Sequence, residues 1–317
     1  MTIPTLKLSS GYEMPVLGLG TWEGKPGEVE KAVEVAVNAG YTHIDCAWVY
    51  GNQMEIGETL KRLFSSGHKR ENIFITSKVW NTFHSAPACK KNVLEILCQL
   101  HLKYIDLMLI HWPIGYEEGG DPFPKRKDCD KIKYSNEDYV TTWKVLEDFV
   151  KEGKIRSIGI SNFNHKQIER LIANSTIKPA VLQIEMHPYL QQKKLRAFCS
   201  ERGIAITAYS PLGCPGSTFF RKPGDPNILT EPSVKKIAAA HGKTPAQVVL
   251  RWAVQQNVIV IPKSTSETRI KENAALFDFQ LTEAEMKEID GLDRGWRFVD
   301  FSPGDSDHPH LPFLEEY

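Results

Sequence analysis

Short apolar runs alternate with longer amphipathic stretches along the whole chain. The runs are rich in Ile, Val, Leu or Thr and are apolar at consecutive positions, which is typical of parallel strands buried on both faces. They lie at 16–20, 43–46, 73–78, 105–110, 157–160, 181–185, 205–208 and 258–261. This pattern predicts eight buried parallel strands.

Apolar residues at helical spacing fill the intervals between these runs. Glycines at Gly40, Gly67 and Gly153 mark the ends of three of the predicted helices. The predicted helical segments are 29–37, 56–64, 93–100, 140–150, 168–172, 195–198, 233–240, 245–255 and 266–275, with a last one starting at the capping box Thr282-x-x-Glu285. Two of these helices fall between the seventh and eighth strands, so one of them is an insertion.

Eight strands alternating with helices predict an α/β fold, a (β/α)8 TIM barrel rather than an open sheet. An N-terminal β-hairpin, formed by 6–8 and 13–16, is predicted before the first barrel strand, and two helices exceed the usual eight. The segments 113–134, 211–231 and the tail from 291 are too long for simple turns. We expect them to be functional loops at the C-terminal face of one barrel domain, residues 1–317.

Charge and composition narrow the class of protein. Lys plus Arg and Asp plus Glu are 39 each, so the formal net charge is zero and no bulk positive field favours a nucleic acid or a membrane as partner. The N-terminus lacks the pattern of a secretory signal, and the six cysteines are scattered. We therefore expect a cytoplasmic protein with reduced thiols.

Polar residues follow nearly every predicted strand, at the barrel end where active sites of this fold lie. Asp45 and Tyr50 follow the second strand, Lys78 the third and His111 the fourth. Taken singly, Asp45, Lys78 and His111 each have an ordinary structural alternative, as a cap, a solvated lysine and a core histidine. Together they form a proton-donor set: Asp45 neutralises a buried Lys78, and Lys78 lowers the pKa of Tyr50. His111 then hydrogen-bonds the same substrate oxygen, as carbonyl reduction requires.

The chain resembles the aldo-keto reductase family, in the branch of aldose and aldehyde reductases. The matching motifs run through nearly the whole chain: Gly18-Leu-Gly-Thr-Trp22, Gly40-Tyr-Thr-His-Ile-Asp-Cys-Ala47, Val49-Tyr-Gly-Asn52, Ile110-His-Trp-Pro113, Gly159-Ile-Ser-Asn-Phe163, Gln183-Ile-Glu-Met-His-Pro-Tyr189, Ala208-Tyr-Ser-Pro-Leu-Gly213 and Ile261-Pro-Lys-Ser264. A dinucleotide fingerprint starting at Gly18 fails, because its sixth position is Glu23 and not glycine.

The resemblance implies that Tyr50 is the general acid of an NADPH-dependent reductase of aldehydes and ketones. It implies that NADPH lies across the barrel mouth with Tyr209 stacked on the nicotinamide and the 2′-phosphate near Lys263 and Arg269. The implied cofactor-binding residues are Gly20, Thr21, Trp22, Asp45, Ser161, Asn162, Gln183, Tyr209, Ser210, Leu212, Lys263, Ser264, Thr265, Arg269, Glu272 and Asn273. Lys263 and Arg269 also flank a predicted helix start, where backbone N–H groups favour an anion.

The substrate pocket is predicted to have apolar walls over a polar floor, which suits lipophilic or aromatic carbonyl compounds and leaves ketosteroids open. Its residues are Trp22, Val49, Tyr50, Trp80, His111, Trp112, Phe123, Trp296, Val299 and Phe301. In relatives that reduce a steroid carbon–carbon double bond, the position of His111 is typically Glu, so histidine favours carbonyl reduction. No metal is expected, and His308 and His310, with Asp305 and Asp307, are predicted to lie in a solvent-exposed tail.

Three positions depart from the family pattern. Related aldose reductases clamp the cofactor with a Lys and an Asp where this chain has Glu23 and Gly216, and a family Ser aligns with Cys214. These changes predict a looser loop and faster NADP release. Two other classes of function stay open: a non-catalytic NADPH-binding barrel acting as a sensor or structural protein, and an unrelated barrel enzyme. Members of this branch are mostly monomers, and a monomer acting on a small-molecule carbonyl substrate is expected.

Overall fold

The strands of the computed structural model, which describes residues 3–301 and 307–317, form a closed parallel barrel. Eight strands pair side by side in the order in which they follow one another along the chain. They are β3 (Leu19–Gly20), β4 (His43–Asp45), β5 (Phe74–Val79), β6 (Ile105–Ile110), β7 (Ile155–Ser161), β8 (Val181–Glu185), β9 (Ala205–Tyr209) and β10 (Val258–Val260). Parallel bridges from Leu17 to Val260 and from Gly20 to Lys263 join the last strand to the first.

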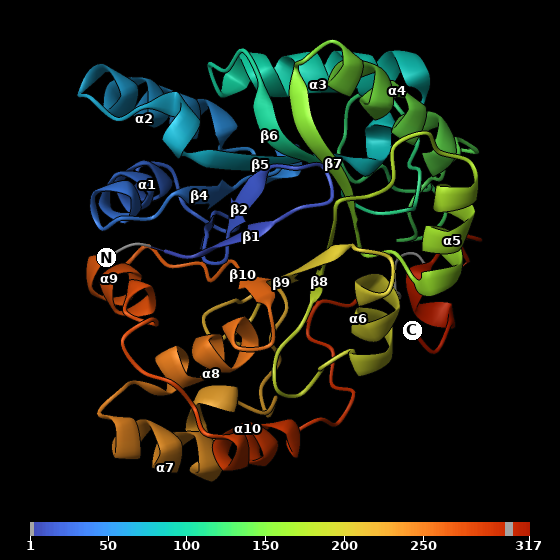
Figure 1. The fold of residues 1–317 in the computed structure, drawn as a ribbon. Helices are drawn as coiled ribbons and strands as arrows, with labels where there is room; N and C mark the ends of the chain where they lie inside the picture. Colours follow the sequence, from blue (N-terminus) through green and yellow to red (C-terminus); the bar gives the residue numbers. More distant parts are fainter. Residues whose placement is uncertain (1–2, 302–306) are drawn as a thin grey trace.

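The helices surround this barrel, as Figure 1 shows. They are α1 (Glu28–Asn38), α2 (Gln53–Ser65), α3 (Ala86–Gln99), α4 (Tyr139–Lys151), α5 (His165–Ala173), α6 (Lys193–Ser200), α7 (Pro232–His241), α8 (Pro245–Val254), α9 (Glu267–Ala274) and α10 (Glu283–Asp290). The helices α7 and α10 lie next to each other outside the ring (Figure 1). The (β/α)8 prediction with two extra helices is therefore confirmed.

The sequence pattern accounts for these elements, although the first barrel strand is shorter than predicted. Central strands such as β5 and β6 are buried at every position, because helices cover one face and the barrel interior fills the other. The run predicted at 16–20 gives a strand of only two residues, Leu19–Gly20, and otherwise contributes isolated bridges. The capping box at Thr282 and Glu285 forms as predicted.

A β-hairpin of β1 (Thr5–Lys7) and β2 (Glu13–Pro15) closes one end of the barrel. Leu8 and Met14 next to its turn pack with Leu107, Val181 and Ile259 from the strands, and all five are nearly inaccessible to solvent. This apolar plug fills the N-terminal end of the barrel, and the opposite end is left open to a ligand.

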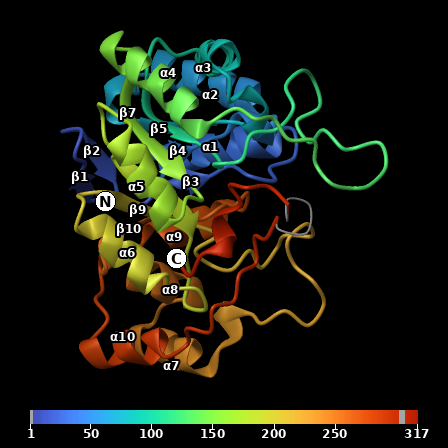
Figure 2. The same cartoon turned by 90° about the vertical axis from the view of Figure 1, so that its right-hand side faces the viewer.

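The long loops gather at that opposite, C-terminal end. Figure 2 shows the loops after β6 and β9 projecting on the same side of the molecule as the C-terminal tail. The predicted placement of these three segments is therefore confirmed, and they surround the mouth of the barrel.

Candidate active site

Four polar side chains from neighbouring strand ends meet at the floor of one cavity. Lys78 on β5 is fully buried, and its Nζ lies 2.5 Å from Asp45 Oδ1 and 3.3 Å from the Tyr50 hydroxyl. Tyr50 follows β4 on the short helix Trp48–Tyr50, and its ring centroid lies 6.0 Å from that of His111, which follows β6. The structure thus brings together the four side chains that were predicted to act on a proton.

The Lys78–Asp45 ion pair is shielded from water and held from several sides. Lys78 also donates to the Cys46 carbonyl at 2.9 Å, and Gln183 Nε2 donates to Asp45 Oδ2 at 2.8 Å. Burial lowers the pKa of Lys78, but Asp45 and Tyr50 raise it by more, so it stands above its usual value. Lys78 is therefore an ammonium at neutral pH, directed at the Tyr50 hydroxyl.

The acidity of Tyr50 differs from the sequence-based expectation. Burial raises the pKa of the phenol above its usual value, and the Lys78 ammonium offsets only part of this rise. The predicted net lowering of the Tyr50 pKa is therefore wrong in this structure, because removing a phenolate from water costs more than one ammonium restores. Tyr50 consequently carries its proton at neutral pH, as a proton donor must.

His111 faces the cavity as a neutral imidazole. Burial, and to a lesser extent the Lys78 ammonium, lowers the pKa of His111 well below its usual value. Within the described part of the chain, its Nδ1 has no hydrogen-bond partner. A neutral imidazole offers one N–H donor and one acceptor, so His111 can hydrogen-bond a ligand oxygen but does not supply a positive charge.

The cavity above these residues has a volume of about 680 Å³ and extends from the barrel centre to the start of α9. Its lining includes every residue predicted to bind cofactor or substrate except two, Ser161 and Trp296. Lys78 lies behind the floor and contacts Asp45 and Tyr50, which both line the cavity. One elongated space therefore joins the acid–base floor to the phosphate-binding residues predicted at its far end.

Amide and hydroxyl groups are locked together beside the floor. Tyr209 donates its hydroxyl to Asn162 Oδ1 at 2.7 Å, and Asn162 Nδ2 donates to the His111 carbonyl and to Ser161 Oγ, both at 3.1 Å. Ser161 is buried and accepts a hydrogen bond from Asn162, which lines the cavity, so the predicted contact of Ser161 with the cofactor stays a prediction.

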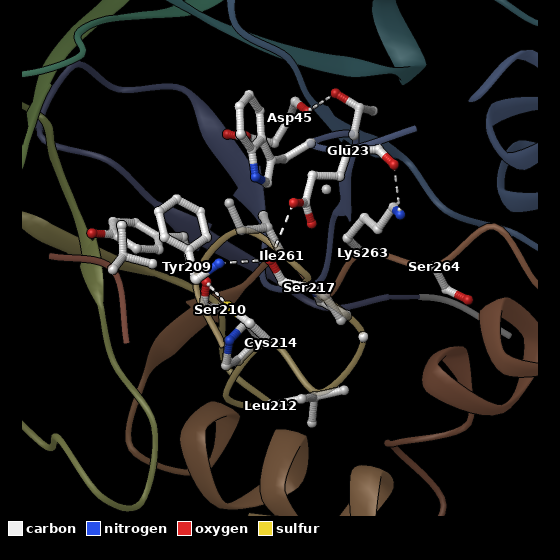
Figure 3. A pocket seen from close by; sticks show the side chains of 18 of the residues that line it. Glu23, Asp45, Tyr209, Ser210, Leu212, Cys214, Ser217, Ile261, Lys263 and Ser264 are labelled. Atoms are coloured by element: carbon white, nitrogen blue, oxygen red, sulfur yellow. Dashed lines mark hydrogen bonds between the residues drawn. The ribbon is translucent and has the colours of Figure 1, made fainter. Parts of the chain in front are cut away.

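Cationic groups lie at the other end of the cavity. Lys263 and Arg269 are exposed, and Ser266 caps α9 by accepting a hydrogen bond from the Arg269 backbone N–H. Lys263 Nζ donates to the Glu23 carbonyl at 3.0 Å, and Ser217 donates to Glu23 Oε1 at 3.1 Å (Figure 3). This end offers two cations and a helix N-terminus to an anionic group.

Aromatic side chains form the remaining walls. Trp80 packs edge-on against Phe123 with ring centroids 5.2 Å apart, and Trp112 packs against Phe301 at the same distance. Phe220 also lines the cavity, 5.7 Å from the Phe301 ring, and was missed because its loop matches no motif. Trp296 does not line the cavity: it is 40% exposed, so its predicted substrate contact is corrected.

Part of the tail described at residues 307–317 is packed rather than solvent-exposed. His308 is buried with its ring 4.5 Å from the Tyr134 ring, and Asp307 accepts from the Tyr134 hydroxyl at 2.8 Å and pairs with Arg126. The predicted solvent exposure is therefore wrong for His308, while Asp305 lies outside the described residues. The described residues contain no group of three side chains suited to hold a metal ion.

Comparison with known proteins assigns the chain to a family. The family model described as "Aldo/keto reductase family" matches residues 16–294. The chain belongs to the aldo/keto reductase family. It is 45% identical to mouse aldo-keto reductase family 1 member A1 over 100% of both chains, and 43% identical to the chicken protein of the same name over 98% and 97%. The solved aldose reductase of Schistosoma japonicum superposes with a TM-score of 0.93 at 44% identity, covering 99% and 100%.

Membership in the aldo/keto reductase family sets the reaction class. The protein is an oxidoreductase that acts on small-molecule carbonyl compounds, and the family generally uses a nicotinamide cofactor. Among the described residues of this aldo/keto reductase, no helix combines the length and apolar character that crossing a membrane requires.

Proposed function

We propose that this protein is an NADPH-dependent reductase, or in reverse an NADP-dependent alcohol dehydrogenase, that converts aldehydes and ketones to alcohols with Tyr50 as proton donor. The observation that carries the proposal is the buried Lys78 ammonium, which contacts both Asp45 and the Tyr50 hydroxyl. We further propose that it acts as a cytoplasmic monomer.

The side chains at the floor divide the proton chemistry between them. The substrate oxygen accepts hydrogen bonds from the Tyr50 hydroxyl and from His111, which orients the carbonyl. The nicotinamide cofactor supplies the hydride when bound. Tyr50 then gives its proton to the developing alkoxide, and the nearby Lys78 ammonium stabilises the phenolate that remains. Asp45 neutralises Lys78, so the buried charges balance.

The chemistry of the cavity lining fits NADPH. Asn162 and Gln183 offer amide groups to a carboxamide beside the flat Tyr209 ring, while Lys263 and Arg269 stand at the far end. Arg269 is exposed, lines the cavity and lies in the first turn of α9. An exposed guanidinium at a helix start suits a phosphate, which favours NADPH over NADH.

The walls support a lipophilic or aromatic carbonyl compound as substrate, with ketosteroids among the possible sizes. Trp22, Trp80, Trp112, Phe123 and Phe301 present apolar surface to the substrate end. The tail between residues 298 and 310 contains three Asp and no Lys or Arg, so it offers no cation to a carboxylate on the substrate. Neutral apolar substrates therefore satisfy this end of the cavity best.

The proposal is tested by following NADPH absorbance with an aromatic aldehyde, a sugar aldehyde, a long-chain aldehyde and a ketosteroid. We expect the aromatic and long-chain aldehydes to give the highest kcat/KM.

Arg269→Met is expected to raise the KM for NADPH roughly tenfold to a hundredfold, because a charge-assisted hydrogen bond is lost, and to leave the KM for NADH nearly unchanged. Equal KM changes for both cofactors would contradict the assigned phosphate site. A wild type that binds NADPH and reduces none of the carbonyls would favour the sensor alternative.

The exchange of cofactor is expected to depend on the charge of Glu23. The Glu23 carboxylate accepts a hydrogen bond from Ser217 on the opposite side of the cavity. This hydrogen bond takes the place of the ion-paired clamp of related aldose reductases, which the sequence predicted to be missing here. Glu23→Gln keeps a hydrogen-bonding group but removes the negative charge facing the cofactor phosphates. We expect about fivefold slower NADP+ release, measured by stopped-flow fluorescence, from about 1 kcal/mol of relieved repulsion. Ser217→Ala serves as the control for the hydrogen bond alone, and an unchanged release rate in Glu23→Gln rejects the charge effect.

A further inference from the structure

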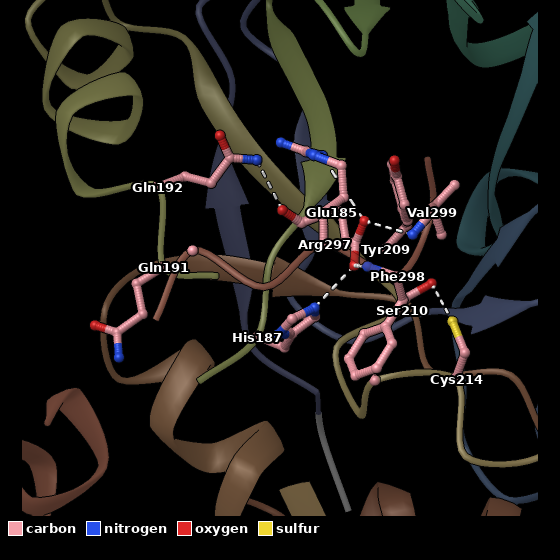
Figure 4. Close-up of polar contacts among 12 residues, drawn as sticks. Glu185, His187, Gln191, Gln192, Tyr209, Ser210, Cys214, Arg297, Phe298 and Val299 are labelled. Carbon is pink, nitrogen blue, oxygen red and sulfur yellow. Dashed lines mark hydrogen bonds and ion pairs between the residues drawn. The ribbon is translucent and has the colours of Figure 1, made fainter. Parts of the chain in front are cut away.

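A buried carboxylate that the proposed chemistry does not use lies at the end of β8. Glu185 is fully inaccessible to solvent and follows Gln183 by two residues on the same strand. Its carboxylate is directed at the C-terminal tail, and Figure 4 shows it enclosed by the chain around residues 297–299. Gln183 contacts Asp45, whereas the contacts of the Glu185 carboxylate among the described residues all lie elsewhere.

Both oxygens of this carboxylate accept hydrogen bonds. Glu185 Oε1 accepts from the backbone N–H of Phe298 at 2.7 Å and from His187 Nε2 at 2.9 Å. Its Oε2 accepts from the backbone N–H of Val299 at 2.9 Å and lies 3.7 Å from the Arg297 guanidinium. Two consecutive amides and one cation of the tail are thus held by a single buried anion, an arrangement stronger than neutral hydrogen bonds.

The loop after β8 holds the preceding part of the tail in a different way. The backbone N–H groups of Arg294 and Trp296 donate to the Tyr189 carbonyl, and Gln191 donates to the carbonyls of Ile289 and Asp290. These are neutral contacts, and they lie further from the cavity along the chain. Glu185, in contrast, holds the amides of Phe298 and Val299, and Val299 lines the cavity.

The held segment forms one wall of the cavity. Val299 is 5% exposed and lines the cavity, and Phe301 follows two residues later. The Phe301 ring packs against Trp112 at 5.2 Å and against Phe220 at 5.7 Å. A shift of the backbone at Val299 therefore moves an aromatic wall that only a bulky substrate reaches.

We propose that Glu185 is a positioning residue that sets the preference for bulky carbonyl substrates by holding Val299 and Phe301 at the cavity wall. The inference rests on the proposed carbonyl reductase function. Glu185 acts through the tail and touches neither the substrate nor the proton-donor set. A small aldehyde binds at Tyr50 and His111 on the floor, so its binding does not depend on the position of the tail. A large substrate also contacts Val299 and Phe301, and it loses these contacts when the tail shifts.

The decisive variant is Glu185→Gln, compared with the chemically matched Glu147→Gln. Glu147 is also buried and accepts from two successive backbone amides, those of Thr176 and Ile177, both at 2.6 Å, but these lie between α5 and the start of β8, away from the cavity. For Glu185→Gln we expect KM for a bulky aromatic ketone to rise about tenfold, with kcat/KM for a short aliphatic aldehyde within about twofold. Glu147→Gln is expected to leave the KM and kcat/KM for both substrates unchanged.

A second variant keeps the proposal testable if Glu185→Gln does not fold. Arg297→Gln weakens the same attachment from the tail and is expected to raise the KM for the bulky ketone about threefold, with no further rise when added to Glu185→Gln. Faster hydrogen exchange at the amides of Phe298 and Val299 in either variant is a readout independent of turnover.

The possible results separate the two ideas. The positioning role is overturned if the KM for the bulky ketone is unchanged in both variants. It is also overturned if kcat/KM falls equally for the bulky ketone and the short aldehyde. A wild type that reduces no carbonyl overturns the proposed function and the selectivity with it, while the exchange rates still report whether Glu185 holds the tail.

Discussion

Replacing Tyr50 by phenylalanine is expected to lower kcat for carbonyl reduction by about a thousandfold. The ring and its contact with Trp22, at a centroid distance of 4.9 Å, remain, and only the hydroxyl is lost. General acid catalysis by a positioned side chain contributes about 10²–10⁴ in rate, and the phenylalanine side chain has no proton to donate. The measurement is single-turnover oxidation of NADPH with an aromatic aldehyde.

NADPH binding, measured by fluorescence, should change little in this variant, because Tyr50 donates its hydroxyl to the substrate. Tyr189→Phe is a suitable control, since it removes a tyrosine hydroxyl bonded to Glu231 outside the cavity. It is expected to keep kcat within about threefold, as for an ordinary side-chain substitution away from the reacting atoms. Retained turnover in Tyr50→Phe would remove Tyr50 from the role of proton donor and leave His111 as the candidate.

Replacing Lys78 by methionine is expected to reduce both activity and stability. The substitution leaves the Asp45 carboxylate buried with one hydrogen bond from Gln183 and no counter-ion. Breaking a buried ion pair from one side costs about 3–5 kcal/mol in the free energy of unfolding. Loss of the ammonium next to Tyr50 is expected to lower kcat about a thousandfold, because the phenolate left after proton transfer is no longer stabilised.

The double variant Asp45→Asn with Lys78→Met separates these two effects. Removing both charges together is expected to restore most of the stability lost in Lys78→Met, as measured by urea unfolding, because no unpaired charge remains. Activity is expected to stay low, since the ammonium is still missing. If the double variant regains turnover along with stability, Lys78 acts only as a structural partner of Asp45.

The arrangement of the barrel could be predicted because its signals are local. Strands buried on both faces read as continuous apolar runs, and helix ends carry caps such as the box at Thr282 and Glu285. The ends of successive parallel strands meet at one edge, so Asp45, Lys78 and His111 could be placed together from their order alone. The same reasoning could not set the length of β3, which covers only Leu19–Gly20 although the apolar run extends over 16–20.

Residues whose role depends on distant contacts escaped sequence reasoning. Phe220 reaches the cavity from a loop with no regular sequence pattern. Trp296 is a large aromatic residue of the kind that lines substrate pockets, but its side chain is exposed to solvent. The buried state of His308 depends on Tyr134, which lies far away in the chain. Glu185 matched a family motif, yet its attachment to Phe298 and Val299 joins segments more than a hundred residues apart.

The sequence by itself determined the parallel barrel, the end at which chemistry lies and the types of side chain gathered there, because strand burial, chain order and residue type are local properties. The tertiary structure alone decided the protonation of Tyr50 and His111, since their pKa values follow from how far each ring is removed from water and from the distance to Lys78. It also decided the shape of the substrate wall, because that wall depends on where a buried carboxylate on β8 holds the tail.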